Sequence, residues 1–518
     1  MLFTLPDRAA LPDDVESLKD LVLEVMRRAS IAAQEASHSI ERLELQLVAL
    51  RRVVFGVRSE RLAGQADLFA LTSALPMPPT LKDRVTYERN RRGRPALPAD
   101  LPRTRVQYDL DEAEKALFAR VLPIGEQVSE TLEFTPARLT VIEHARLKYR
   151  CENADGTSTI RTASAEPSPL SKSNAGPGLL AHVLVSKYAD ALPLARQERM
   201  FARHGVTLSR KTLCDWVLRA CELLGALRAP LHAHILGAPV IFGDDTTLRL
   251  IVQEMARKTV TARLWAYISA GETRDAHGAW VAYPKAALYE FTTDRGGEHP
   301  RRFLARYRGY LQADDYGGYH ALYRSRRVLH AACWAHARRG FIEIDRGAKT
   351  PGLARQALAW ITKLYEIERE IREHPPDLKR SVRRARTRPL LHEFRRWLMG
   401  VEPELLPQGP MAKAVRYVLS NWRALLRFTS NGILAPDSNL VERGMRPIAV
   451  ARKNWLYAGA ERGGHAAATA FSLIETCKLN GINPYEYLKD VLARIGGHRS
   501  DRLAELLPFN WRPLGTSV

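Results

Sequence analysis

Cysteine is scarce in this sequence, and its scarcity excludes two classes of small stabilised domain. Five cysteines are scattered over 518 residues without a CxxC pair: Cys151, Cys214, Cys221, Cys333 and Cys477. This spacing argues against a disulfide framework and against a complete four-cysteine zinc site.

Long apolar runs are also missing. No stretch of about 18 apolar residues occurs, so we expect no membrane span. The first residues, MLFTLPDRAALPDDVESL, have neither the basic head nor the apolar segment of a signal peptide. We therefore expect a cytoplasmic protein.

Negative charge is scarce relative to positive charge. The chain has 57 Asp and Glu against 78 Lys and Arg, a formal net charge of +21. This excess favours a polyanionic partner, with nucleic acid ahead of a membrane surface, although a basic enzyme without such a partner is the alternative. A 46% hydrophobic chain of this length predicts several domains with their own cores.

The first third of the chain alternates between helical and irregular patterns. Apolar residues recur every three or four positions over residues 13–54, which fits either a coiled coil or a packed helical hairpin. A Pro- and Arg-rich stretch at 74–106 is typical of a linker. Residues 107–165 alternate apolar and polar side chains at strand period.

Residues 178–225 predict a helix-turn-helix. A helix is followed by a turn at Gly205, by Ser209 as N-cap, and by a second helix that presents Arg210 and Lys211 early. Many helical pairs without DNA contacts share this pattern, so the motif alone leaves the alternative open.

From residue 238 the pattern predicts the order β-β-β-α-β-α-β-α. The expected strands are PVIFGDD, RLWAYIS, ALYEFTT, YLQAD and VLHAAC, and helical patterns continue over residues 350–430 and roughly 438–495. This order describes a multidomain α/β protein with a ribonuclease-H-like sheet and a helical insertion.

Two aspartate pairs stand at the ends of apolar strand patterns in this sheet. Asp244 and Asp245 follow the first strand, and Asp314 and Asp315 follow the fourth. By themselves, Asp, Tyr and Gly-Gly are ordinary turn residues. In the expected strand order, however, the first and fourth strands are neighbours, so one aspartate from each can face the other.

Facing carboxylates suit a metal ion. Each raises the pKa of the other unless a cation lies between them, and hard oxygen ligands suit Mg²⁺. A pair of such ions stabilises the attacking and leaving oxygens of a phosphoryl displacement. Glu442 in DSNLVERGMRPIAVARKNW is the candidate third carboxylate, although alone it could simply pair with Arg443 and Arg446.

Longer motifs carry a family resemblance over almost the whole chain. They are GDDTTLRL, LQADDYGGY, CWAHARRGF, and the block from DSNLVERGMRPIAVARKNWLYAGAERGGH to NGINPYEYL. With these motifs the chain resembles the DDE transposases of the insertion-sequence-66 family. FGVRSERL and the helix-turn-helix segment are similar to that family's leader and DNA-binding region.

The resemblance implies roles for particular residues. The family's Asp-Glu-Thr corresponds to Asp244-Asp245-Thr246, its second Asp to Asp314, and its Asn-x-x-Glu-Arg to Asn439 through Arg443. The catalytic and metal-binding roles therefore carry over to Asp244, Asp314 and Glu442. The expected cofactor is two Mg²⁺ ions, with Mn²⁺ as a substitute.

Several basic residues are candidates for DNA contact. They are Arg210, Lys211, Arg338, Arg443, Arg446, Arg452 and Lys453. The charge run KRSVRRARTR could be a solvated face or could bind phosphate, and the sequence favours neither. Cys333 and His336 have Cys-x-x-His spacing, which is a weak metal signal and more typical of packing beside the site.

Family members often carry a cysteine zinc module before the helix-turn-helix, and this chain departs from it. DEAEKALFARV replaces the first cysteine pair, and only Cys151 remains of the second. One cysteine cannot form a four-thiolate site, so we predict that the module is kept without zinc.

The expected domains are eight segments of the chain. They are a helical leader (1–62), a basic linker (74–106), a degenerate zinc module (107–170), a helix-turn-helix (178–228), the ribonuclease-H-like core (235–345), a helical insertion (350–430), the part of the core with the glutamate (431–495) and a C-terminal tail (496–518).

We predict a transposase that binds terminal inverted repeats and catalyses metal-dependent DNA cleavage and strand transfer. A metal-dependent nuclease on the same fold and a transposase-derived DNA-binding protein without catalysis are the alternatives. The expected partners are end and target DNA, further copies in a homodimer or larger oligomer, and accessory proteins of the same element. The resemblance implies a bacterial, nucleoid-associated location.

The second aspartate of each pair has a different expected role. Strand alternation places Asp314 toward Asp244 and turns Asp315 to the other side, where we expect it to cap the helix near Gly317. In the same way Asp245 is expected to be a neighbour of the ligand Asp244.

Overall fold

The computed structural model describes residues 14, 139–144, 147–152, 158–162, 168–252, 258–348 and 352–513. Clustering of contacts divides the chain into one unit of residues 1–66 and 146–518 and a second of residues 67–145. In the second unit, the described residues 139–144 are exposed and have no regular structure. The predictions for the leader, the linker and the first part of the zinc-like module lie outside the described residues.

The described remainder of the strand-rich segment is a two-stranded hairpin. Strand β1 (Lys148–Glu152) pairs antiparallel with β2 (Ser158–Thr162). Its alternating sequence pattern therefore indicated the correct secondary structure.

In the described part of the chain, four helices precede the main sheet. They are α3 (Pro177–Tyr188), α4 (Leu194–Arg203), α5 (Arg210–Leu224) and α6 (Arg228–Leu236), with a 3-10 turn η2 (Gly225–Leu227) before α6. The turn after α4 contains Gly205 with a φ of +76°, which glycine adopts without a Cβ clash. Ser209 accepts a hydrogen bond from the Thr212 N–H, so the predicted N-cap is confirmed.

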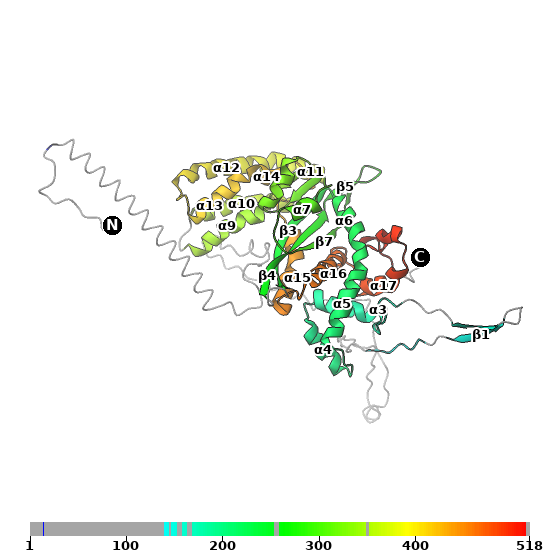
Figure 1. The fold of residues 1–518 in the computed structure, drawn as a ribbon. Helices are drawn as coiled ribbons and strands as arrows, with labels where there is room; N and C mark the ends of the chain where they lie inside the picture. Colours follow the sequence, from blue (N-terminus) through cyan, green and yellow to red (C-terminus); the bar gives the residue numbers. More distant parts are fainter. Residues whose placement is uncertain are drawn as a thin grey trace, which may run out of the picture. The chain divides into compact units, whose positions relative to one another are not determined.

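The main sheet has five strands in the order β7-β4-β3-β8-β9. Strands β3, β4 and β7 are labelled in Figure 1. Strands β7 and β3 flank β4 in antiparallel pairs, and β3, β8 and β9 run parallel. The strands are β3 (Val240–Val252), β4 (Lys258–Ala270), β7 (Ala286–Thr292), β8 (Gly309–Gln312) and β9 (Val328–Ala331). The chain is thus a mixed α/β protein in which the first and fourth predicted strands are neighbours.

Two features of this region differ from the prediction. Strand β3 does not end at the aspartate pair but continues to Val252, because the β-branched residues after it pair with the first half of β4. A short hairpin of β5 (Glu272–Arg274) and β6 (Trp280–Ala282) was not predicted, since three-residue strands carry too little periodicity.

The two faces of the sheet are covered by different helices. Helix α15 (Asn439–Trp455) packs on the face that carries Tyr289, whose hydroxyl donates a hydrogen bond to the Gly444 carbonyl at 2.7 Å. Helix α7 (Glu298–Phe303) packs on the other face, where the Phe303 ring stacks on Tyr267 at 3.8 Å. Between β8 and β9 lie η4 (Gly317–Tyr319) and α8 (His320–Arg324).

Helix α16 (Glu461–Leu479) closes the outer edge of the sheet. The backbone N–H groups of Ala287 and Tyr289 on edge strand β7 donate to the hydroxyls of Thr476 and Ser472. A Cβ on Gly464 would lie 2.5 Å from the Phe291 ring, so only glycine permits this approach. Side chains of α16 thereby satisfy an edge that would otherwise be open to other strands.

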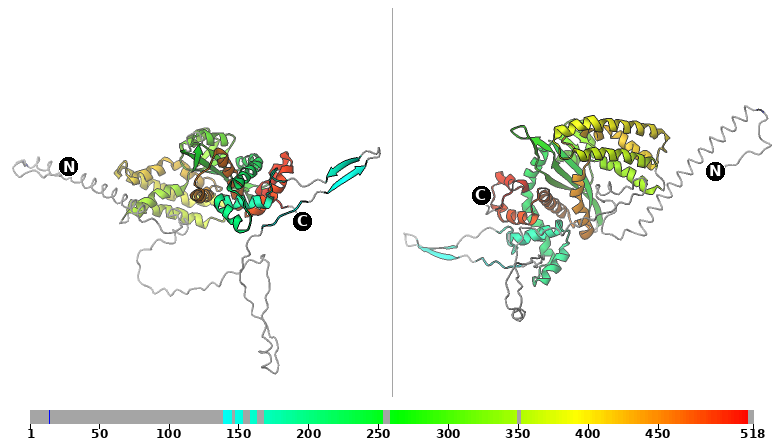
Figure 2. Two further views of the ribbon diagram at one scale, coloured as in Figure 1. Left: turned by 60° about the horizontal axis from the view of Figure 1, so that its bottom comes forward. Right: turned by 180° about the vertical axis from the view of Figure 1, so that it is seen from behind.

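The predicted helical segment between the second and third carboxylates is confirmed as helices that lie side by side (Figure 2). They are α9 (Trp334–Gly347), α10 (Leu353–Glu370), α11 (Pro376–Val382), the π-helical turn η5 (Arg383–Thr387), α12 (Arg388–Val401), η6 (Glu402–Glu404), α13 (Pro410–Ser420), α14 (Trp422–Leu426) and η7 (Arg427–Thr429).

Arg383 in the charge run KRSVRRARTR is buried. Its guanidinium pairs with Glu368 at 2.7 Å and donates to the carbonyls of Phe428 and Leu434. Arg380 and Arg384 of the same run are exposed. One arginine of the run thus makes a structural contact, whereas others lie on the exposed surface.

The chain ends in α17 (Pro484–Arg494) and the 3-10 turns η8 (Ile495–Gly497), η9 (Ser500–Leu506) and η10 (Pro508–Asn510). Leu506 and Leu507 are buried in the common core, so this segment packs as part of the fold. Within the described part of the chain, every helix is too short or too polar to cross a membrane.

Candidate active site

Asp244 lies in the middle of β3 on the face that α15 covers. In the sheet register it is paired with Ala266, which is paired in turn with Tyr289, the residue that contacts α15. Burial raises the pKa of the Asp244 carboxyl to about 6, and the charge of Asp314 adds to the rise. The backbone N–H of Asp245 donates to Asp244 Oδ1 at 2.8 Å, which limits the rise.

Asp314 lies two residues beyond the end of β8, the strand that pairs with β3. Gln312 is paired with Phe242, so two residues farther along each parallel strand the side chains of Asp314 and Asp244 come to the same face. Burial raises the pKa of Asp314. Burial is the largest cause of both rises, and the charge of Asp314 also raises the pKa of Asp244.

Glu442 lies in the first turn of α15, and Gly444 brings this turn close to the sheet. A Cβ on Gly444 would lie 2.8 Å from Ile268 Cδ1 and 2.9 Å from the Tyr289 hydroxyl oxygen. Glycine in the ERG sequence therefore allows the helix to approach the sheet and fixes the height of Glu442 above it.

His336 interacts with all three carboxylates. Its Nε2 lies 3.4 Å from Glu442 Oε1, and its charge lowers the pKa of both Asp244 and Asp314. Arg339, one turn later on α9, approaches the same Glu442 oxygen at 3.2 Å. Glu442 therefore does not pair with the arginines of its own helix, as the simpler interpretation required, but with two side chains of α9.

Helix α9 is held in place by the loop that leads into α15. The Trp334 N–H donates to the Pro436 carbonyl at 2.9 Å, and the Ser438 N–H donates to Cys333 Sγ at 3.2 Å. The thiol of Cys333 is completely buried, so the CWAHARRGF motif packs beside the site as predicted. The same contacts place His336 and Arg339 opposite Glu442.

Asp245 has a separate, structural environment. Its side chain is 5% exposed and pairs with Arg263 at 2.9 Å and Arg295 at 2.7 Å. It lies on the opposite face of β3 from Asp244 because successive side chains of a strand alternate. The predicted division of this pair agrees with the geometry.

The predicted cap by Asp315 is wrong. The turn η4 has no side-chain cap, and Asp315 instead lies 3.2 Å from His320 Nε2 and accepts from the Asn421 amide at 3.1 Å. Asp314 accepts the backbone N–H of Tyr316 at 3.2 Å, in the manner of an Asx turn. The turn begins one residue too late for Asp315 to serve as its N-cap.

The predicted DNA-contacting residues fall into three groups. Arg210 and Lys211 at the start of α5, and Arg443, Arg446 and Lys453 on α15, are exposed. Arg452 is half-buried and donates to the hydroxyl and carbonyl of Thr247 on β3. Arg338 is 7% exposed, whereas the neighbouring Arg339 is exposed.

Sequence reasoning missed His336 and Arg339 as neighbours of the glutamate. The available signal was their place after β9, because the ends of adjacent parallel strands lie at one edge of a sheet. Asp437 was also missed. Burial raises its pKa, and it accepts the Asn439 N–H at 3.2 Å beside the start of α15.

The donor set fits hard divalent cations. Asp244, Asp314 and Glu442 supply oxygen ligands only, and the buried aspartates repel each other in the absence of a cation. The oxygens of these three carboxylates do not all lie within 4.8 Å of one another. Carboxylates that share two ions need not all contact the same ion, so this spread is compatible with a two-ion site.

Another group of ligand-type side chains lies at the start of α7. Among the described residues, donor atoms of Asp294, Glu298 and His299 lie within 4.8 Å of one another. Asp294 and Glu298 are exposed, and Asp294 already accepts hydrogen bonds from the Gly296 N–H and from His299. These hydrogen bonds belong to the turn that begins α7, so the turn itself accounts for the closeness of the three side chains.

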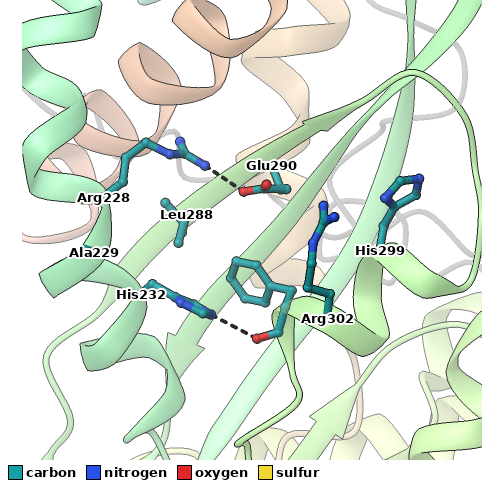
Figure 3. Close-up of a pocket in the computed structure, with 8 residues that line it drawn as sticks. Arg228, Ala229, His232, Leu288, Glu290, His299 and Arg302 are labelled. Atoms are coloured by element: carbon teal, nitrogen blue, oxygen red, sulfur yellow. Dashed lines mark hydrogen bonds and ion pairs between the residues drawn. The ribbon is translucent and has the colours of Figure 1, made fainter.

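A pocket of about 240 Å³ lies between α6, β7 and α7 (Figure 3). Arg228 and Glu290 point toward each other there and form a 2.7 Å ion pair, and His232 bonds to the Phe303 carbonyl. Glu290 is in register with Trp265 and therefore with Asp245. The pocket thus opens on the face opposite Asp244 and contains none of the predicted site residues.

Four family descriptions match consecutive parts of the chain. Residues 172–466 match "Transposase IS66 family", and residues 472–509 match "IS66 C-terminal element". Residues 42–106 match "Transposase C of IS166 homeodomain", a range that includes the predicted linker. Residues 119–153 match "zinc-finger binding domain of transposase IS66", and Cys151 is the one cysteine in that range.

Three similar proteins from Sinorhizobium fredii extend over nearly the same length. The uncharacterized protein y4hP is 33% identical over 91% of this chain and 88% of its own. The uncharacterized protein y4jD is 33% identical over 97% of both chains, and y4qI is 32% identical over 98% of both.

Proposed function

The chain belongs to the IS66 family of transposases, and on that basis we propose that it cleaves DNA at the ends of its element and joins them to target DNA. The observation that carries the proposal is the convergence of Asp244, Asp314 and Glu442 around His336. These residues come from strand β3, the end of β8 and helix α15, which are far apart in sequence. The strand order of the sheet supports a ribonuclease-H-like core.

We propose that Asp244, Asp314 and Glu442 hold two Mg²⁺ ions, which would activate the attacking oxygen and stabilise the leaving oxygen of an in-line displacement. His336 and Arg339 hold the Glu442 carboxylate in place and remain close enough to interact with a DNA phosphate. Arg452 fixes α15 to β3, and so keeps Glu442 in register with Asp244. We propose that the module matching the zinc-finger description holds no zinc, because Cys151 is the one cysteine in its range.

DNA recognition is assigned to the amino-terminal modules and to the exposed arginines. Arg210 and Lys211 lie exposed at the start of the second helix of a helix-turn-helix, where such motifs contact DNA. Arg443, Arg446 and Lys453 extend along α15 from Glu442. Because two element ends must be held together, we propose a dimer or larger assembly on DNA. Accessory proteins of the same element are further proposed partners.

A strand-transfer assay separates this function from its alternatives. The protein is incubated with Mg²⁺, a target plasmid, and labelled duplexes that copy the terminal repeats flanking the gene. A transposase yields 3′-nicked ends and joined products. Nicked ends without joined products identify a nuclease, and binding without either product identifies a DNA-binding protein that has lost catalysis.

A further inference from the structure

Helix α15 presents one exposed face, and this face is basic along its length. Its exposed residues beyond Glu442 are Arg443, Arg446, Val450 and Lys453. Their spacing of three and four residues places them on one side of the helix. From residue 443 to 460 the chain has four basic residues and no Asp or Glu.

This basic face ends at two exposed apolar side chains. Leu456 is 58% exposed and Tyr457 is 46% exposed, immediately after the last turn of α15. We call Leu456 and Tyr457 the apolar tip. Among the described residues from 168 to 513, Leu456 and Tyr457 are the only two neighbours in sequence that are both large, apolar and exposed.

The backbone of the apolar tip is a strained turn. Leu456 has φ +61° and ψ −46°, and the Tyr457 N–H donates to the Trp455 carbonyl at 2.7 Å. These values define a classic γ-turn, a rare conformation that glycine would adopt at lower cost. A bulky residue in such a conformation often marks a site where its side chain has a function.

The apolar tip is anchored on both sides. The Leu456 N–H donates to the Arg452 carbonyl within α15, and the Ala458 N–H donates to the Arg249 carbonyl on β3 at 2.8 Å. Trp455 beneath it packs edge-on against Tyr188 and lies 4.9 Å from Lys187 Nζ. The backbone on both sides of these two exposed side chains is therefore fixed, as insertion between DNA bases requires.

We propose that the exposed face of α15 is a track for the end DNA and that the apolar tip inserts beside a base of that DNA and unstacks it. This inference rests on the proposed function. Phosphates match the arginines and lysine of the track by charge, and bases present apolar faces that aromatic and aliphatic side chains bind or wedge apart. A protein surface would have to combine acidic and apolar groups in the same order to match it.

The helix sets the distance from the active site. Glu442 and Leu456 are 14 residues apart in sequence, which corresponds to ~21 Å at 1.5 Å per residue. At 3.4 Å per nucleotide step this equals about six nucleotides. The contacted base therefore lies about six nucleotides from the phosphate held at Glu442.

The test uses 2-aminopurine, whose fluorescence increases when the base is unstacked. Duplexes that copy the flanking terminal repeat carry it at each position from 1 to 12 in turn, and anisotropy of the same duplexes reports binding. The variants are Leu456→Gly, which keeps and relaxes the turn, and the double variant with Tyr457→Ala. Met399→Ala is the matched control, because Met399 is a 53% exposed apolar residue on α12.

The wild type and the Met399 control are expected to show a fluorescence maximum near position six. The double variant is expected to lose this maximum and to bind about 5- to 100-fold more weakly. Binding without a maximum, or a maximum that persists in the double variant, overturns the inference. So does a change of oligomeric state in the variant at unchanged fluorescence, which would identify the apolar tip as an interface between copies.

The failure of this inference is distinguishable from failure of the proposed function. If the wild-type protein joins DNA ends without a fluorescence maximum, the proposed function stands and the inference about the apolar tip is wrong. If the protein shows the maximum but joins no DNA, the apolar tip is a DNA contact and the proposed catalytic function is wrong.

Discussion

Asp244 and Asp245 are adjacent in the chain but lie on opposite faces of β3, in environments of opposite character. Asp244 is near another buried carboxylate, whereas Asp245 is held by two arginines. The first arrangement disfavours negative charge in the absence of a cation, and the second requires it. One residue is thus suited to bind a metal ion and its neighbour to stabilise the fold.

Substituting the two aspartates should therefore have opposite effects on stability. In metal-free buffer at pH 8, Asp244→Asn is expected to raise the free energy of unfolding, because it removes a disfavoured charge. Asp245→Asn is expected to lower it by about 2 kcal/mol, less than the ~3–5 kcal/mol of a fully buried pair, since both arginines are partly exposed. Urea unfolding measures both. A loss of stability in Asp244→Asn would contradict the environment assigned to it.

Metal binding should depend on pH through Asp244. Its folded pKa of about 6 exceeds the ordinary 3.8, so its contribution to metal-free stability is full below about pH 3.8 and is lost as the pH rises through 6. Mg²⁺ binds the deprotonated form, so its affinity should fall by about tenfold per pH unit below pH 6. The increase in Tm caused by Mg²⁺ measures this, with Asp244→Asn as control. An equal increase at pH 5 and pH 8 would refute it.

At the scale of helices and strands, the site depends on how closely α15 approaches the sheet. Gly444 determines this approach, and the loop held by Cys333 and Trp334 determines where the helix begins. The sequence predicted the helix and the importance of its glutamate. It could not predict the partners of Glu442, because His336 and Arg339 lie more than 100 residues away and reach it only through tertiary packing.

Gly444→Ala tests this dependence. The added methyl group would meet Ile268 and Tyr289 at less than 3 Å and displace the first turn of α15. We expect strand transfer to decrease by about 100-fold, the effect of a misplacement of ~1 Å, and stability to decrease by about 1–3 kcal/mol. Gly400→Ala in α12 is the matched helical control, because a Cβ there meets nothing within 4 Å. Equal activity of the two variants would show that the close approach is not needed.

At the scale of the whole molecule, the strand order was predictable because each strand had its own apolar pattern and was followed by a distinct helix or turn. The neighbouring positions of β3 and β8 follow from that order. The extension of β3 beyond the aspartates was not predictable locally, since it depends on pairing with β4. The burial of Arg383 within a run of exposed basic residues likewise depends on a partner, Glu368, from another helix.

The candidate site is assembled from distant parts of the chain, including a helix that lies between Asp314 and Glu442 in the sequence. Helices α9 and α13 pack together, and α9 carries the side chains that hold Glu442. The candidate site therefore depends on α9, which precedes the helical insertion and packs against α13 within it. No single motif supplies all of its contacts.

We propose that Asp314, and not the adjacent Asp315, belongs to the catalytic centre. The most direct test is strand transfer in Mg²⁺ by Asp314→Asn and Asp315→Asn, with binding to the end duplex measured in parallel. We expect Asp314→Asn to bind DNA and to fall to the background of the assay, while Asp315→Asn stays within a few-fold of the wild type. Joined products formed by Asp314→Asn at the wild-type rate would show that catalysis does not require this carboxylate.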